Sequence, residues 1–207
     1  MIPAFRAALE RLDRPAAEEI FTQALSRHTP IQAVESLIVP ALEQLGAEWE
    51  KGEAALSQVY MGGRFCEWMV DRCLPPSDPD RKHQPRSAIV TLSDHHELGK
   101  RIVYSMLRAS GFEVYDYGCM EVEELVERVC RDRLHALLIS TLMLTSALRV
   151  TEVCRVLRER RPELRIQVGG APFGFDPELW REVGADAMGR NAGEAVTWLQ
   201  RMMQERP

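Results

Sequence analysis

Along the first 73 residues, apolar side chains recur at the spacing of an α-helix. They fall on one stripe at Ala16, Ile20, Phe21 and Ala24, and on a second at Leu37, Ala41, Leu42 and Leu45. The pattern predicts four helices, over residues 3–13, 15–28, 30–51 and 56–73. Because proline lacks an amide hydrogen and crowds the preceding turn, Pro40 is expected to kink or interrupt the third helix. Four successive amphipathic helices favour a four-helix bundle.

From Ser87 onward, short apolar runs alternate with amphipathic segments. The apolar runs predict strands over residues 87–92, 112–118, 136–143, 165–170 and 185–188. The amphipathic segments predict one helix from Leu98 that is ended by Gly111, and further helices over residues 121–133, 149–161, 176–183 and 191–205. Consecutive β–α units predict an α/β fold, a Rossmann-like (flavodoxin-like), doubly wound, five-stranded parallel sheet of strand order 2-1-3-4-5.

A proline-rich segment separates the two patterns. Residues 75–86, PPSDPDRKHQPR, contain four prolines and no large apolar side chain, which is typical of an exposed and semi-extended linker. We therefore expect a helical bundle cap domain over residues 1–74, the linker over residues 75–86, and the Rossmann-like domain over residues 87–207.

Composition and charge narrow the class of protein. With 45% hydrophobic and 28% charged residues, the 207-residue chain has an ordinary globular composition. No apolar run approaches the roughly 20 residues that span a bilayer, and the N-terminal segment is charged where a signal peptide is apolar. The net charge of −5 disfavours direct contact with nucleic acid. Five cysteines without zinc-binding spacing indicate reduced thiols, so we expect a cytoplasmic protein.

The least ordinary residues follow the first predicted strand. Asp94 and His96 lie in the loop that precedes the next helix, and Gly99 allows that helix to approach the loop closely. A carboxylate two residues before an imidazole can accept one ring N–H and leave the other nitrogen free to bind a metal. The alternative is a polar loop in which Asp94 caps the helix and the histidines are exposed.

Two further loops reach the same edge of the sheet, because ligands of such sheets bind at the carboxyl ends of the strands. Ser140 and Leu142 belong to the end of the third predicted strand, where small hydroxyl residues can also simply satisfy the loop backbone. Gly169 and Gly170 end the fourth, where paired glycines permit either a close ligand or a tight turn.

Taken together, Asp94-x-His96-x-x-Gly99, Ser140-x-Leu142 and Gly169-Gly170 form a pattern that resembles the DxHxxG…SxL…GG signature of cobalamin-binding domains. Lys100 and the pair Ala171-Pro172 flank these motifs as they do in the corrinoid proteins of methyltransferase systems, relatives of the cobalamin module of methionine synthase. In that family a helical bundle precedes the Rossmann-like domain and covers the upper face of the corrin. The segment over residues 37–61 also resembles that bundle.

The resemblance assigns roles to these residues. It implies that His96 is the lower axial ligand of cobalt, with Asp94 bonded to its other nitrogen and Ser140 in the same network. The nucleotide tail of cobalamin would run along Ser140, Leu142, Gly169 and Gly170. His95 is the rival cobalt ligand, but its register with the rest of the motif is worse.

The resemblance also implies that Trp49 and Tyr60 lie over the upper face of the corrin and exclude water, although both residues could equally serve bundle packing. Methyl carriers usually have Pro-Glu where this chain has Ser57-Gln58, and related photoreceptors have Glu-His where it has Val59-Tyr60. The cap therefore matches neither subfamily.

Two functions follow from the resemblance. The first is a corrinoid (cobalamin) carrier that shuttles a methyl group between methyltransferase proteins, one donor-side and one acceptor-side, through Co(I) and methyl-Co(III). On that view the chain is a subunit of a methyltransferase system rather than a stand-alone enzyme, and it could form an oligomer. The alternative is a cobalamin-binding sensor, light-responsive or not, that acts through a protein partner. An adenosylcobalamin mutase subunit and a module that no longer binds cofactor fit the residues less well.

Overall fold

The computed structural model describes residues 1–73 and 84–205, so most of the predicted linker, residues 75–83, lies outside the described residues. The contacts divide the chain into two compact units. One comprises residues 1–84 with 105–113, and the other comprises residues 85–104 with 114–207. Each unit is described by itself below. Among the described helices, none is long and apolar enough to cross a lipid bilayer.

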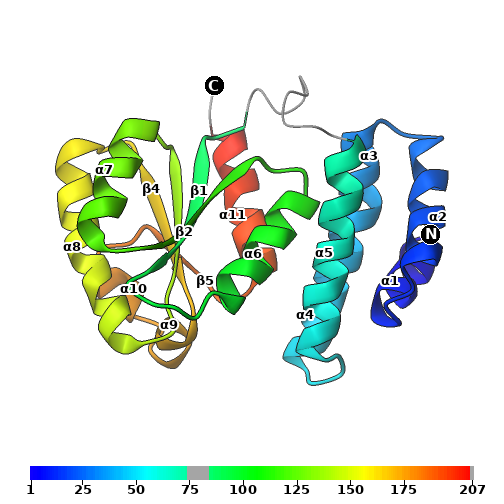
Figure 1. Ribbon diagram of the computed structural model, residues 1–207, viewed down its shortest axis with the longest axis horizontal. Coiled ribbons are helices and arrows are strands. Elements are labelled where there is room, and N and C mark those ends of the chain that lie inside the picture. Colours follow the sequence, from blue (N-terminus) through cyan, green and yellow to red (C-terminus); the bar gives the residue numbers. More distant parts are fainter. Residues whose placement is uncertain (74–83, 206–207) are drawn as a thin grey trace. The chain divides into compact units, whose positions relative to one another are not determined.

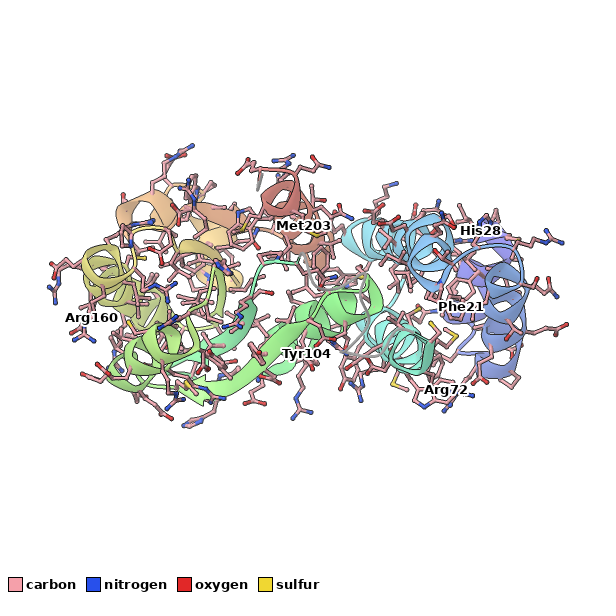
Figure 2. The ribbon with its side chains drawn as sticks, turned by 90° about the horizontal axis from the view of Figure 1, so that it is seen from above. Phe21, His28, Arg72, Tyr104, Arg160 and Met203 are labelled. Atoms are coloured by element: carbon pink, nitrogen blue, oxygen red, sulfur yellow. The ribbon has the colours of Figure 1, made fainter. Side chains whose placement is uncertain are left out.

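The first unit is helical (Figure 1). Its segments are α1 (Ile2–Glu10), α2 (Arg14–Leu25), α3 (Pro30–Ala33), the π-helical η1 (Val34–Ile38), α4 (Val39–Glu50) and α5 (Leu56–Cys73). The core includes Phe5, Leu9, Phe21, Leu42, Leu45 and Val70, all at most 3% exposed. Figure 2 labels Phe21 of α2 in this unit, whereas His28 beyond the end of α2 is exposed.

The predicted helix over residues 30–51 is interrupted, as expected, close to Pro40. The amide of Val39 donates to the carbonyl of Val34, five residues earlier, which is the bond of a π-turn. Pro40 follows as the second residue of α4. The wider turn places Pro40 where its missing N–H and bulky ring break no α-helical bond.

Residues 105–113, predicted as part of the second domain, group by their contacts with the helical unit. The Ser105 hydroxyl donates to the buried Glu67 of α5 at 2.9 Å. Arg108 is also buried; its guanidinium pairs with Asp71 of α5 and with Glu113. Glu67 and Asp71 of α5 therefore each have a partner in a segment that lies more than 30 residues later in the chain, and Glu67 also pairs with Arg64 on α5.

The second unit is a five-stranded parallel sheet of order β2-β1-β3-β4-β5, which confirms the predicted Rossmann-like, doubly wound fold. The strands are β1 (Ser87–Leu92), β2 (Val114–Met120), β3 (Ala136–Ser140), β4 (Arg165–Gly169) and β5 (Ala187–Gly189). The helices are the first part of α6 (Leu98–Ala109), whose residues 105–109 group with the helical unit, and α7 (Val122–Asp132), α8 (Leu144–Arg160), α9 (Ala171–Phe175), α10 (Leu179–Glu182) and α11 (Ala192–Gln204). Helices α7 and α8 cover one face of the sheet and α11 the other (Figure 1).

Several predicted boundaries were wrong. Strand β2 begins at Val114 instead of 112, and the predicted helix over 176–183 is reduced to the short helix α10, with another short helix, α9, before it. Helix α8 begins at Leu144, five residues before the predicted start, and β3 ends at Ser140. The first turn of α8 carries exposed side chains, and its buried stripe starts with the small Ser146 and Ala147, so the apolar period is weak there.

The two faces of the sheet differ at its carboxyl edge. Residues of β1, β3 and β4 that face α7 and α8 are large and apolar, among them Val90, Leu92, Ile139 and Val168. The alternate residues point to the opposite face, and those at the strand ends are small. This edge carries the motif residues.

Candidate functional site

Asp94 is held at the centre of the site by four hydrogen bonds. Its Oδ1 accepts the backbone N–H of His96 at 3.0 Å and lies 2.7 Å from His96 Nδ1. Its Oδ2 accepts the amides of Leu142 and Met143 at 3.0 and 3.2 Å. Burial alone would raise the pKa of Asp94, but the bonds from His96 and from the two amides hold that pKa well below its usual range. The group is therefore a carboxylate and a pure acceptor.

The Asp94 carboxylate determines which nitrogen of the His96 ring carries the proton. Because Asp94 can only accept, Nδ1 is the nitrogen that carries the proton when the His96 ring is neutral, and Nε2 then presents its lone pair. The His96 side chain is 62% exposed, so Nε2 is open to a ligand. His95, the rival, is exposed and makes no such bond with Asp94 within the described part of the chain. The structure thus brings Asp94 and His96 together as an oriented imidazole.

A row of small residues crosses the sheet beside this pair. Thr91, Ser140, Gly169 and Gly189 are register partners on β1, β3, β4 and β5, so they share one face. A Cβ at Gly169 would lie 3.0 Å from the carbonyl oxygen of Gly189, and one at Gly99 would lie 3.7 Å from Ser140 Oγ. A side chain at Gly169 would therefore crowd the backbone of β5, whereas one at Gly99 would make ordinary contact with Ser140, and the row brings Ser140, Gly169 and Gly99 together.

Sequence reasoning missed Thr91 and Gly189. The signal for them is the strand register, which places Thr91 opposite Ser140 and Gly189 opposite Gly169. The fifth strand was predicted to end at residue 188, one residue before Gly189.

Gly170 has a structural reason to be glycine. Its φ is +116°, and a Cβ there would lie 1.8 Å from the carbonyl oxygen of Thr141. The amide of Thr141 donates to Gly169 at 3.1 Å. The loops after β3 and β4 are therefore pressed together, backbone against backbone, at this point.

Leu142 contributes through its backbone amide, which is bonded to Asp94, while its side chain is exposed. It belongs to a set of exposed apolar residues on or just after the loops that follow β1, β3 and β4. The set is Leu98, Leu142, Met143, Leu144 and Phe175.

Trp49 and Tyr60 belong to the helical unit. Trp49 lies one residue before the end of α4 and is 39% exposed, so it does not extend the buried stripe of that helix. Tyr60 is half-buried in the first turns of α5. The neighbouring Gln58 accepts the amide of Ala55 at 2.6 Å and donates to the Glu10 carbonyl at 2.8 Å, so it caps α5 and ties it to α1. A position of Trp49 and Tyr60 over a cofactor remains a prediction.

Replacing Thr91 by valine is expected to raise the free energy of unfolding of the cofactor-free protein by about 1 kcal/mol. Thr91 is fully buried, and its Oγ1 has no hydrogen-bond partner among the described residues. Chemical denaturation monitored by circular dichroism tests this. Thr197→Val is the matched control, since that hydroxyl donates to Gly193 and its loss should not stabilise the fold. A destabilised Thr91→Val variant would mean that the hydroxyl is already satisfied.

Comparison with known proteins identifies the two parts of the chain. Two families, each described as a B12 binding domain, match residues 88–197 and residues 2–73. The trimethylamine corrinoid protein of Methanosarcina barkeri is 30% identical over 201 residues, which is 92% of this chain and 91% of that protein.

Solved structures agree with the fold. A cobalamin-binding protein from Desulfitobacterium hafniense DCB-2 superposes with a TM-score of 0.77 at 23% identity, over 97% of this chain and 98% of that one. The monomethylamine corrinoid protein of Methanosarcina barkeri superposes with a TM-score of 0.56 at 27% identity, over 96% of each chain.

Proposed function

Because this chain belongs to the B12-binding family of corrinoid proteins, we propose that it carries a methyl group between the methyltransferases of one pathway. Its cofactor is a corrinoid, cobalamin or a close relative. When bound, the corrinoid supplies the chemistry, since its cobalt accepts and releases the methyl group. The protein supplies binding, axial ligation and presentation.

The single observation that carries the proposal is the Asp94–His96 pair at the carboxyl edge of the sheet. In our proposal His96 binds cobalt from below through Nε2, and Asp94 fixes the ring and its tautomer. The amides of Leu142 and Met143 hold Asp94 in turn, so the imidazole cannot rotate freely. An imidazole oriented in advance binds a metal without the cost of ordering the side chain.

The row of small residues fits the nucleotide tail of the cofactor. Thr91, Ser140, Gly169 and Gly189 leave the face of the sheet free of bulky side chains, and the unpartnered Thr91 hydroxyl offers a hydrogen bond. Gly99 keeps the start of α6 close to Ser140 without filling the space. The exposed apolar residues Leu98, Leu142, Met143, Leu144 and Phe175 fit contact with a largely apolar macrocycle.

Two partners follow from the carrier role. One methyltransferase loads the methyl group from a small methylated compound, and another passes it to an acceptor. Relatives are named after trimethylamine and monomethylamine, so we propose a methylated amine as the donor. A cobalamin-dependent sensor is the second candidate, favoured by the exposed Trp49 and by Gln58, which here caps α5 instead of providing the usual cap carboxylate.

Visible absorption spectra distinguish the two functions. The purified protein is incubated separately with hydroxo-, methyl- and adenosylcobalamin, and its spectrum and assembly are measured in the dark and after illumination. Tight binding of hydroxo- and methylcobalamin with His-on bands, and an assembly that illumination leaves unchanged, supports the carrier. Selective uptake of one alkylcobalamin, with a light-driven change of assembly, would establish the sensor instead. Failure to bind any of the three would overturn both.

A further inference from the structure

Ser93, the residue between β1 and Asp94, has an unusual backbone. Its φ is +46°, in the left-handed region, which only Leu12, Ser93 and Arg133 share among the described residues that are not glycine. Glycine would adopt this conformation more easily than serine. The surrounding structure must therefore hold Ser93 in place.

Four groups do so. The Ser93 amide donates to the carbonyl of Met120 at 2.9 Å, and its carbonyl accepts the hydroxyl of Ser146 at 3.0 Å. Its own hydroxyl donates to Glu121 Oε2 at 2.8 Å and accepts from an Arg149 guanidinium nitrogen at 2.8 Å. The same nitrogen of Arg149 is 2.5 Å from Glu121 Oε2. We call Ser93, Glu121, Ser146 and Arg149 the Ser93 anchor.

The anchor joins the starts of two helices, α7 and α8, to the loop after β1. Glu121 precedes the first residue of α7, while Ser146 and Arg149 lie in the first two turns of α8. The hydrogen bonds from Ser93 and Arg149 lower the pKa of Glu121, so its side chain is a carboxylate at neutral pH and a stable partner for the guanidinium.

The anchor is one peptide bond away from the carboxylate that orients His96. The amides of Leu142 and Met143 fix the side chain of Asp94 from the β3 side. Those amides fix only the carboxylate oxygens, and the anchor fixes the backbone from which that side chain leaves. Asp94 is therefore held both at its carboxylate and through the backbone of the preceding residue.

Building on the proposed function, we propose that Arg149 is a positioning residue for the cobalt ligand. Through Ser93 and Glu121 it holds the loop after β1 in the strained conformation that places Asp94 and His96. It acts on cobalt ligation without touching the cofactor. Loss of Arg149 should let Ser93 relax and should weaken the orientation of His96.

The test compares Arg149→Met with Arg155→Met. Both arginines are on α8, but Arg155 is exposed, and among the described residues its ion pair is with Glu159, 3.9 Å away on the same helix. Two readouts are measured: hydroxocobalamin binding with its His-on absorption, and amide hydrogen exchange of His96, Leu142 and Met143 in the cofactor-free protein. We expect Arg149→Met to bind about tenfold more weakly, with a larger base-off fraction and faster exchange of the three amides. Arg149→Lys should recover part of the loss, and Arg155→Met should match the unaltered protein.

If Arg149→Met fails to fold, Ser93→Ala replaces it, because it removes the hydroxyl and leaves Arg149 and Glu121 paired. Unchanged amide exchange together with unchanged His-on absorption in a folded variant would overturn the positioning role and leave the proposed function intact. If the unaltered protein binds no cobalamin, the proposed function fails, and the exchange measurement still decides whether Arg149 holds the loop.

Discussion

Replacing His96 by alanine is expected to convert the absorption of the bound cobalamin from the His-on to the base-off form while the protein stays folded. His96 is largely exposed, so its removal disturbs little packing. It is, however, the residue that presents an oriented nitrogen beside Asp94. We expect cofactor affinity to fall by at least tenfold, since an axial ligand and its preset geometry are both lost. Absorption spectra and equilibrium binding of hydroxocobalamin measure the effect.

His95→Ala is the matched control, because it removes the adjacent imidazole and leaves the Asp94–His96 bond in place. That variant should keep the His-on spectrum. The reverse result, a normal spectrum for His96→Ala and a base-off spectrum for His95→Ala, would make His95 the ligand. It would also mean that the loop rearranges when the cofactor binds.

Replacing Gly170 by alanine is expected to lower the free energy of unfolding by about 3 kcal/mol or more. Two costs add at this residue. A side chain at a φ of +116° is strained, and its Cβ would lie 1.8 Å from the carbonyl oxygen of Thr141, a contact that forces the backbone to move. Urea denaturation followed by circular dichroism measures the loss.

Gly174→Ala, four residues further along in α9, provides the comparison. Its φ is not positive, and no heavy atom lies within 4 Å of an added Cβ, so the change should be within about 0.5 kcal/mol of zero. If Gly170→Ala is as stable as Gly174→Ala, the loops after β3 and β4 are not packed as tightly as described. The paired glycines would then serve a ligand alone.

The pattern of the chain predicted the fold class because alternating β–α units depend on local periodicity, and the strand order followed from the flavodoxin-like topology expected of such units. Five apolar runs separated by helices permit few parallel sheets, and the carboxyl edge of such a sheet is a fixed consequence of its topology. Asp94 and His96 were found because they stand two residues apart in one loop, so their closeness can be read from the sequence even though other segments fix their orientation.

What the sequence did not show depends on contacts between distant segments. The amide of Leu142 donates to Asp94, 48 residues earlier in the chain. Such a bond cannot be predicted from the residue type, because every residue except proline has a backbone amide. Thr91 and Gly189 were recognised as part of the site only from the strand register, which pairs them with Ser140 and Gly169. The early start of α8 was not predicted, because the side chains of its first turn are exposed and its first buried residues are small. This first part of α8 carries Ser146 and Arg149, which contact Ser93.

The contacts of residues 105–113 determine which segments of this protein can be exchanged with those of a relative. The helical unit is discontinuous in the sequence, because it includes Ser105 and Arg108, which lie between the first and second strands of the sheet. A recombination event that moved only the first 84 codons would leave the buried Glu67 without its serine and Asp71 without its arginine. A chimaera with a relative should therefore exchange residues 105–113 together with the helical unit, as one block, to keep both contacts.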